Sequence, residues 1–311
     1  MSYSGQEAIA FLSAQVEQDD PGSSSHWDMY HRNFVVREDG SFSGLQGFGD
    51  CSPQYRGMRS LVHKVLQHKY RRMAKIFPEF DRLDRCALSI TEKQCRAYSL
   101  DFLRQTITLA FLKKHLPSLN DQSVVAVIGD GFASMTTLLL ASRLAKKILL
   151  VNLNKTLLVD LVYYRKWAVS HSDCTLNLVV DAEGLTQSMN SGGEGVIAIQ
   201  SVNHALLQRV SVDLVINIAS MQEMDPPVIA DYFEDMRVMS KDKELYFYCC
   251  NREEKQLPDG TITRFTDYPW HVLDLVLVDE LCPWHQQYYA KYPPFYRPYD
   301  GPLRHRLVRI S

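Results

Sequence analysis

The sequence predicts an α/β protein whose sheet is mostly parallel and covered by helices on both faces. Two short apolar runs, 124–128 and 148–153, are too short for helices and indicate buried strands. A glycine turn, Gly129-Asp130-Gly131, follows the first run, and an apolar helical segment over 133–145 follows the turn. Continuous apolar strands that alternate with helices are typical of a parallel sheet buried on both sides. In such sheets a ligand binds beyond the carboxyl ends of the strands, near the N-terminus of the first helix.

The first 116 residues are predicted to be mainly helical. A short helix is expected over 7–16, and residues 56–77 place apolar side chains at helical spacing beside many basic ones. That charge run is either a solvated helix face, which is the commoner case, or a surface for an anionic substrate. A further helix is predicted over 91–114, because Leu116-Pro117 ends the pattern. We expect residues 1–116 to form a lid or the acceptor side of a site, and residues 117–311 to form the ligand-binding domain.

The C-terminal half continues the alternation of strands and helices. Apolar runs predict strands over 176–180, 196–200, 213–219 and 244–250. Glycine and serine indicate a loop over 184–195, and Pro226-Pro227 indicates the start of a helix that runs to Met239. The charged segment 251–260 is expected to be a loop. The last two runs, 273–281 and 303–310, are predicted to pair antiparallel and close the sheet.

Composition excludes several classes of protein. The chain has 311 residues and a net charge of -2, whereas nucleic-acid binders usually show a basic excess. No apolar run approaches the roughly 20 residues of a membrane span, and the acidic N-terminus lacks the basic region of a secretory signal. Seven cysteines are scattered without CxxC spacing, as in a cytoplasmic protein with reduced thiols. We therefore expect a small-molecule partner, neither nucleic acid nor membrane, and leave a homo-oligomer open.

The glycine turn narrows the choice of cofactor. It reads Gly129-Asp130-Gly131-Phe132-Ala133-Ser134, so the third glycine of the dinucleotide fingerprint is missing. The turn also lacks the lysine of a P-loop, and the chain holds no YxxxK pair of a short-chain dehydrogenase. The layout instead resembles the Rossmann-like sheet of class I S-adenosylmethionine-dependent methyltransferases, which is mostly parallel and ends in an antiparallel strand pair.

The C-terminal half resembles a bacterial sugar O-methyltransferase family that is associated with surface-polysaccharide genes. The resemblance rests on the segments 213–233, 246–270, 279–289 and 299–308, and is most specific at 251–255 and 282–285. It covers roughly the last 190 residues well and the N-terminal part loosely. It implies methyl transfer from S-adenosylmethionine to a hydroxyl of a sugar, with a nucleotide sugar or a polysaccharide precursor as the acceptor.

The resemblance also implies which residues bind the cofactor. The glycine turn would lie under the methionine part, and a residue at the end of the second strand would bind the ribose hydroxyls. Asn152 or Asn154 stands there in place of the usual acidic residue, and Val127 stands where the first strand often has an acid. The predicted cofactor-binding residues are Gly129, Asp130, Gly131, Asn152, Asn154, Gln200, Ser201 and Asn217.

A sugar hydroxyl is a weak acid, so a general base or a metal should assist its methylation. The candidate bases are Glu223, His271 and His285; Glu223 is equally placed to cap the helix that starts near Pro226, and each histidine alone is more often structural. The predicted substrate-binding residues are Asn251, Arg252, Trp270 and Trp284. No metal site is predicted, because the scattered acids and histidines over 271–285 show no HxxxH-like signature.

Three other functions stay open on the sequence. The first is O-methylation of a natural-product scaffold with sugar-like hydroxyls. The second is a non-catalytic methyltransferase-like binding protein, which the departures at Val127 and Asn152 or Asn154 keep open. The third is an NAD-dependent oxidoreductase, which the incomplete glycine fingerprint disfavours.

Overall fold

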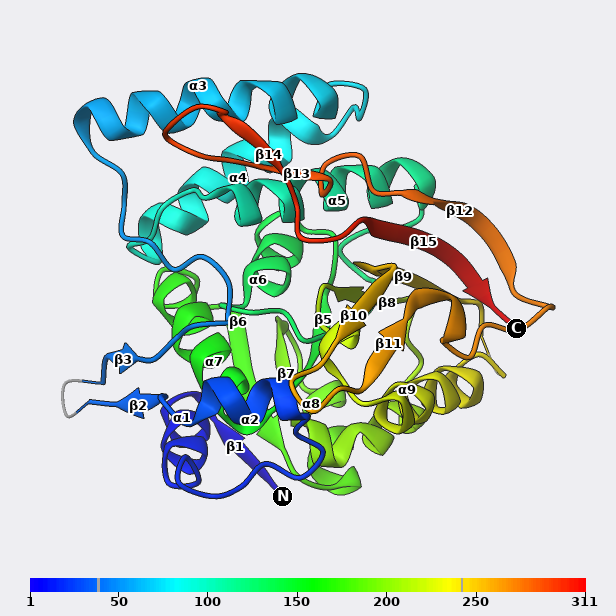
Figure 1. Cartoon of the computed structure of the whole chain (residues 1–311). Coiled ribbons are helices and arrows are strands. Elements are labelled where there is room, and N and C mark those ends of the chain that lie inside the picture. Colours follow the sequence, from blue (N-terminus) through cyan, green and yellow to red (C-terminus); the bar gives the residue numbers. More distant parts are fainter. Residues whose placement is uncertain (38–39, 242) are drawn as a thin grey trace.

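The computed structural model describes residues 1–37, 40–241 and 243–311 (Figure 1). Among them, nine strands form the main sheet. These are β1 (Ser2–Ser4), β4 (Val124–Ile128), β5 (Lys147–Asn152), β6 (Cys174–Val179), β7 (Glu194–Gln200), β8 (Leu214–Ile218), β9 (Leu245–Arg252), β12 (Leu275–Leu281) and β15 (Leu303–Ile310). Their order across the sheet is β1-β6-β7-β5-β4-β8-β9-β15-β12.

The strand order defines the fold class. Strands β6, β7, β5, β4, β8 and β9 are parallel, and β15 runs antiparallel between β9 and β12. The order β7-β5-β4-β8-β9-β15-β12 is that of the Rossmann-like class I methyltransferase fold, and the predicted closing antiparallel pair is confirmed. The chain leaves β4 toward β5 and later returns on its other side to β8, so the switch point of the sheet lies at the end of β4.

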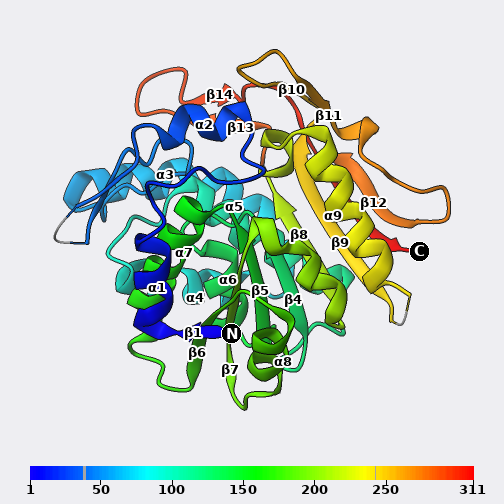
Figure 2. The same cartoon turned by 90° about the horizontal axis from the view of Figure 1, so that it is seen from below.

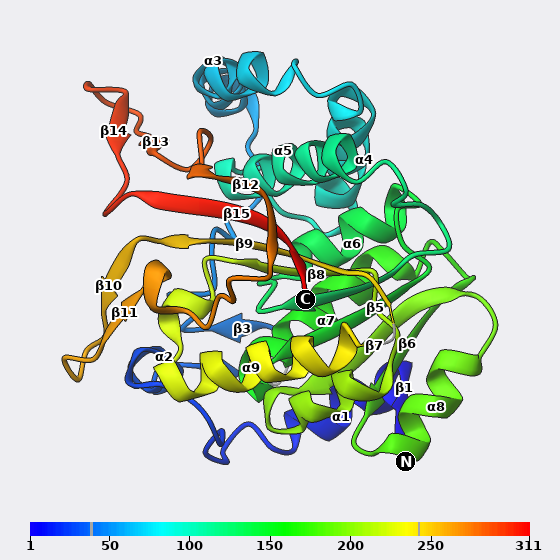
Figure 3. The same cartoon turned by 90° about the vertical axis from the view of Figure 1, so that its right-hand side faces the viewer.

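Helices cover both faces of the sheet, as Figure 3 shows for α5 and α6 on one side and α9 on the other. The helices are α1 (Gly5–Ser13), α2 (Ser25–His31), α3 (Gly57–Ala74), α4 (Phe80–Lys93), α5 (Leu100–His115), α6 (Ser134–Ala141), α7 (Asn154–Ala168), α8 (Ala182–Asn190) and α9 (Pro226–Met239), with 3-10 turns η1 (Ser201–Arg209), η2 (Met221–Glu223) and η3 (Phe265–Asp267). No described helix combines the length and apolar character that crossing a membrane requires.

Side chains of each strand alternate between two cores. Val125 and Val127 of β4 pack in the core formed with α1 and α4 to α7, whereas Ala126 and Ile128 pack in the core formed with α8, η1 and α9. All four are buried, which explains why the strand is apolar without interruption. Val127 is therefore a core residue.

The N-terminal region shares a core with the sheet. Strand β1 pairs antiparallel with β6, and Ala8 and Leu12 of α1 belong to the same apolar core as the strands. Figure 2 shows α2 at one end of the sheet, and α2 lies beside the small hairpin β10 (Glu254–Gln256)–β11 (Ile262–Arg264), whose Asp259 amide donates to Ser25 Oγ. A second hairpin, β13 (Gln287–Tyr289)–β14 (Tyr296–Pro298), lies beside α3 (Figure 1). A third hairpin joins β2 (Val35–Val36) to β3 (Phe42–Ser43).

Three predictions of local structure were wrong. The segment 91–114 is not one helix, because α4 ends at Lys93 and α5 begins after Ser99, whose side chain accepts a hydrogen bond from the Phe102 amide. Residues 182–190 form α8 where a loop was predicted, capped by the Asp181 carboxylate. Residues 254–264 form a hairpin where a charged loop was predicted.

Candidate active site

A cavity opens at the carboxyl ends of the parallel strands. Its empty volume is about 1050 Å³, and it lies against the glycine turn after β4 and the segments after β8 and β9. The N-terminal region and the segment after β12 close its other sides. The lining residues that matter below are Arg96, Arg104, Gly129, Asp130, Gly131, Asn152, Ser220, Glu223, Arg252, His285 and Tyr299.

The floor of the cavity requires glycine at two positions. Gly129 and Gly131 have φ values of +69° and +71°, which side chains rarely adopt. A Cβ on Gly129 would stand 2.0 Å from the Ser220 Oγ, and one on Gly131 would stand 2.9 Å from the Phe48 carbonyl oxygen. The turn is therefore packed between the segment after β8 and the loop that contains Phe48.

Asp130 points into the protein rather than into the cavity opening. Its two carboxylate oxygens accept hydrogen bonds from the amides of Met135 (2.8 Å) and Thr136 (2.7 Å) at the start of α6. Burial raises the pKa of Asp130, although those hydrogen bonds oppose the rise. These two amides are therefore already occupied by Asp130, and the carboxylate of a ligand would have to bind another positive group.

Asn152 at the end of β5 is also engaged by its own chain. Its Oδ1 accepts from the Leu153 amide (3.0 Å) and the Thr156 hydroxyl (2.8 Å), and its Nδ2 donates to Asp160 (2.9 Å). Burial and the nearby Asp130 raise the pKa of Asp160 to about 8. The one remaining N–H of Asn152 is the donor that a ribose hydroxyl could use.

Arg96 places a positive charge beside the glycine turn. Only 4% of this residue is exposed, and its guanidinium donates to Gln94 Oε1 (2.7 Å) and Ser134 Oγ (2.9 Å). No carboxylate of the described residues lies within ion-pair distance of it. Burial lowers the pKa of Arg96 to about 10, which still leaves it charged at neutral pH. Sequence reasoning missed this residue, because nothing near position 96 forms a recognisable motif.

Glu223 also lines the cavity and forms an ion pair. Its Oε1 lies 2.8 Å from the Lys255 ammonium and 3.4 Å from His26 Nε2. Burial alone would raise the pKa of Glu223, but the nearby His26 and the charge of Lys255 hold it below its ordinary value. Glu223 is thus an ionised, paired carboxylate and a weak proton acceptor.

Two further arginines, Arg104 and Arg252, line the cavity near Tyr299. Arg252 donates to Asp300 (2.9 Å) through Nη1, and its Nε is buried with no hydrogen-bond partner among the described residues. Arg104 donates to the carbonyls of Trp284 and Gln287. Both guanidiniums lie over the ring of Tyr299, at 5.2 Å for Arg104 and 5.4 Å for Arg252. This side of the cavity offers donors and an aromatic face.

A smaller pocket of about 380 Å³ adjoins the cavity beyond Gly129 and Asn152. Ser201 lines it, and the N-terminal segment reaches it through Gly22 and Trp27. The same segment covers the neighbouring strand ends, since the Asn154 amide donates to Asp20. The two pockets share five lining residues: Trp27, Gly129, Asn152, Ser220 and Glu223.

Four of the predicted cofactor and substrate residues lie behind the cavity lining. Gln200 donates to Asn154 (2.6 Å) and to Gln15 (2.9 Å). Asn217 donates to the Ile128 carbonyl, and Asn251 donates to Asn217 Oδ1 (2.8 Å). The side-chain oxygens of Asn217 and Asn251 accept from the backbone at Met221 and Gln222, so these two side chains fix the segment that carries Glu223.

Three other predicted residues lie away from the cavity. Trp270 packs on Phe233 with ring centroids 4.9 Å apart, in the core on the α9 side. His271 is exposed in the following loop. Trp284 is buried and donates to the Thr108 hydroxyl (2.9 Å). The aromatic clusters before the two histidines are thus core packing at these positions.

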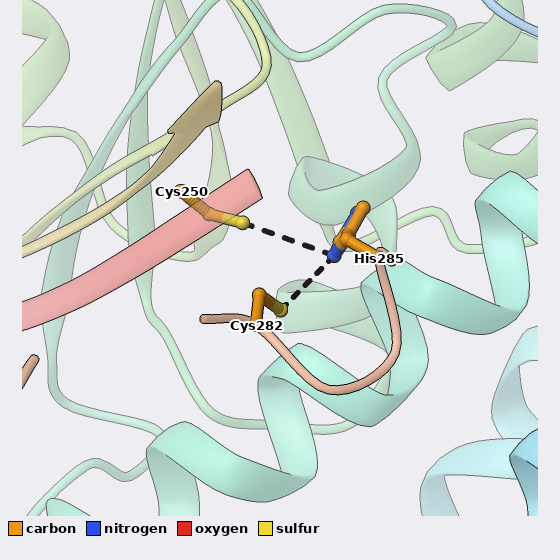
Figure 4. Close-up of side chains that lie close together, drawn as sticks. All are labelled: Cys250, Cys282 and His285. Atoms are coloured by element: carbon orange, nitrogen blue, oxygen red, sulfur yellow. Dashed lines mark hydrogen bonds between the residues drawn. The ribbon is translucent and has the colours of Figure 1, made fainter. Parts of the chain in front are cut away.

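His285 does line the cavity, and it lies beside two buried thiols. Its Nδ1 is 3.2 Å from Cys282 Sγ and 3.8 Å from Cys250 Sγ (Figure 4). The prediction of no metal site considered His285 only with the acids near it in the sequence. The Cys282-x-x-His285 spacing was the signal that could have revealed this group.

No protein family model and no curated protein sequence matches this chain. Several solved structures share its outline. A protein of echinomycin biosynthesis linked to conversion of a disulfide bond into a thioacetal group is 10% identical over 66% of this chain and 81% of its own, with a TM-score of 0.41. A Leishmania major SAM-dependent methyltransferase is 11% identical over 66% and 72%, with a TM-score of 0.34. A mutant form of MtNAS is 10% identical over 98% and 96%, with a TM-score of 0.37. Similarity at this level does not extend to activity.

Proposed function

We propose that this protein is an S-adenosylmethionine-dependent O-methyltransferase that acts on a hydroxyl of a sugar. The observation that carries the proposal is the cavity at the switch point of the class I methyltransferase sheet, with the glycine turn 129–131 as its floor. The resemblance of the C-terminal segments to sugar O-methyltransferases supports the choice of acceptor.

The two adjoining pockets suit an elongated cofactor. We place the methionine part over the glycine turn in the large cavity and the adenosine part in the smaller pocket near Ser201. The shared residues Gly129, Asn152 and Ser220 would then lie beside the ribose and the sulfonium. The N-terminal segment around Trp27 would cover the adenosine.

Arg96 is the natural partner of the cofactor carboxylate. It is a buried cation beside the turn without an ion pair of its own among the described residues, whereas the α6 amides already bind Asp130. A charge-assisted hydrogen bond in such a water-poor place is strong and fixes orientation. The methyl group would consequently point toward the acceptor side.

The acceptor side suits a sugar that carries an anionic group. Tyr299 lines this side and holds the guanidiniums of Arg104 and Arg252 over its ring. Arg252 has a buried Nε without a partner in the part of the chain that the structure describes, and a guanidinium recognises a phosphate or a carboxylate with paired donors. The phosphate of a sugar phosphate, or the diphosphate of a nucleotide sugar, would accept a hydrogen bond from the Arg252 Nε.

The hydroxyl proton is expected to leave on the His285 side of the cavity. Glu223 is a poor base, because the Lys255 ammonium pairs with it, and we assign it a role in positioning. His271 lies in an exposed loop outside the cavity lining. Methyl transfer then needs the acceptor oxygen about 3 Å behind the methyl carbon, with water excluded.

Calorimetry and product analysis test this proposal. We expect the protein to bind S-adenosylmethionine and its demethylated product but not NAD, and to add one methyl group to a member of a panel of sugars and nucleotide sugars, detected by mass spectrometry. NAD binding without binding of either sulfur compound would indicate an oxidoreductase. Cofactor binding with methylation only of hydroxylated natural products would change the acceptor, and binding without any methylation would indicate a binding protein.

A further inference from the structure

Cys250, Cys282 and His285 bring two sulfurs and a ring nitrogen together inside the protein. Cys250 belongs to β9, Cys282 directly follows β12, and His285 lies in the turn after it. Figure 4 shows the two thiols and the imidazole pointing toward one another. Both cysteines are fully buried and His285 is 6% exposed. The three donor atoms all lie within 4.8 Å of one another.

The distances match the edges of a metal coordination tetrahedron. A zinc ion binds sulfur at about 2.3 Å and imidazole nitrogen at about 2.1 Å, so a tetrahedral angle sets the S···N separation at about 3.6 Å. The observed Sγ···Nδ1 separations are 3.8 Å for Cys250 and 3.2 Å for Cys282. The two S···N separations therefore agree with those around a bound zinc ion to within a few tenths of an ångström, and the two sulfurs lie within 4.8 Å of each other.

The surrounding backbone holds the three side chains in place. Strand β9 directs Cys250 toward the helical core of α5, while its neighbour Cys249 faces the opposite core. The Cys282 amide donates to the Leu303 carbonyl (2.8 Å), and the His285 amide donates to the Cys282 carbonyl (3.1 Å). Side chains that are already fixed by their surroundings favour metal binding, because they lose little conformational freedom when the ion binds.

We propose that Cys250, Cys282 and His285 form a binding site for a zinc-like divalent metal ion. Two thiolates and one imidazole are a donor set typical of zinc, and the two thiolates balance its charge. No fourth cysteine, histidine or acidic residue joins the group in the described part of the chain. Three protein ligands with an open fourth position are the arrangement of catalytic zinc sites, whereas structural sites have four.

The site adjoins the acceptor cavity, because His285 is the one of the three ligands that lines it. This step rests on the proposed methyl transfer. A metal ion held here would lower the pKa of a sugar hydroxyl bound to it, so that the hydroxyl would lose its proton to cavity water more readily. In the methyl transfer that would follow, the O–C bond would form as the S–C bond breaks, and the cofactor would leave as a neutral thioether. With its Nδ1 bound to the metal, His285 would be a ligand and not a free base.

The metal content of the purified full-length protein tests the site without any cofactor or acceptor. We expect about one zinc per chain by elemental analysis, or, after chelation and addition of Co²⁺, a sulfur-to-cobalt charge-transfer band in the near ultraviolet. Cys282→Ser and His285→Gln should each weaken cobalt binding at least tenfold. Cys249→Ser is the matched control, since it alters the adjacent buried thiol on the opposite face, and it should bind cobalt like the wild type.

Three results would overturn the proposal. One is wild-type protein with reduced thiols that binds neither zinc nor cobalt, which decides the question even if the variants fail to fold. Another is equal loss of cobalt binding in Cys249→Ser and Cys282→Ser. The third is a Cys250–Cys282 disulfide in protein isolated without reductant, which would make the pair a redox site. Wild-type protein that binds S-adenosylhomocysteine but no metal ion would contradict only this inference. Wild-type protein that binds the metal ion but not S-adenosylhomocysteine would contradict only the proposed function.

Discussion

Replacing Arg96 by methionine should selectively weaken binding of the cofactor carboxylate. Arg96 is 4% exposed, so water cannot easily replace a lost contact with the ligand. A hydrogen bond to a charged group contributes about 1.5–3 kcal/mol. Since about 1.4 kcal/mol corresponds to a tenfold change in Kd, we expect Arg96→Met to bind S-adenosylhomocysteine about 10- to 100-fold more weakly.

The same variant should bind 5′-methylthioadenosine like the wild type, because that ligand lacks the amino-acid part. Calorimetry with both ligands measures the difference directly. Thermal unfolding is measured first, because Arg96 also donates to Gln94 and Ser134. Arg85→Met, a change at an exposed position of α4, is the control. A folded Arg96→Met protein that binds S-adenosylhomocysteine like the wild type, or that loses both ligands equally, would refute the role assigned to Arg96.

Three further substitutions test the floor and the surroundings of the cavity. Gly129→Ala should abolish cofactor binding and lower the melting temperature, since its Cβ would overlap Ser220, and adding Ser220→Gly should restore part of both. Burial raises the pKa of Asp20 to about 6, above its ordinary 3.8. The protonated Asp20 side chain therefore contributes its full stabilisation of the fold below about pH 4, and this contribution is lost as the pH rises through 6. Asp20→Asn should raise the melting temperature at about pH 7 and leave it unchanged near pH 4. The pKa of Glu223 is lowered, so the ionised Glu223 side chain stabilises the fold at neutral pH, and this stabilisation is lost in acid. Glu223→Gln should destabilise the protein by about 1–3 kcal/mol at neutral pH, because the substitution leaves Lys255 unpaired, and by less at low pH.

Matched controls separate these effects from general damage. Gly192→Ala meets no atom within 4 Å, and Asp19→Asn and Glu183→Gln alter exposed carboxylates. Each control should unfold like the wild type. Unchanged cofactor binding in Gly129→Ala would contradict the packing of the floor. A lower melting temperature of Asp20→Asn at neutral pH, or a loss in Glu223→Gln that is the same at every pH, would contradict the assigned charge states.

The fold was predictable from the sequence because its central parallel strands, such as β4, β5 and β8, are buried on both faces. The pattern over 303–310 matches β15, and Pro226 marks the start of α9. The break between α4 and α5 was missed, because the apolar spacing continues across it and Ser99 is only one of several capping residues nearby. Helix α8 was missed because glycine and serine around it are typical of loops, although Asp181 caps it.

The candidate site was predictable only where it is local in sequence. The glycine turn and Glu223 follow strand ends and were placed beside the cavity by pattern alone. Arg96 reaches the same cavity from the N-terminal region, and packing between α4 and α6 decides its position rather than any motif. The Cys250 thiol meets Cys282 and His285 only because β15 brings β9 and β12 close together, which no spacing in the sequence encodes.

A crystal structure of the protein with bound S-adenosylhomocysteine tests the central claim most directly. We expect the homocysteine part above residues 129–131 with its carboxylate on Arg96, the adenosine near Ser201, and the sulfur facing the space between Arg252 and His285. A ligand bound elsewhere on the protein, or a sulfur that faces away from that space, would contradict the assignment of this cavity as a methyl-transfer site.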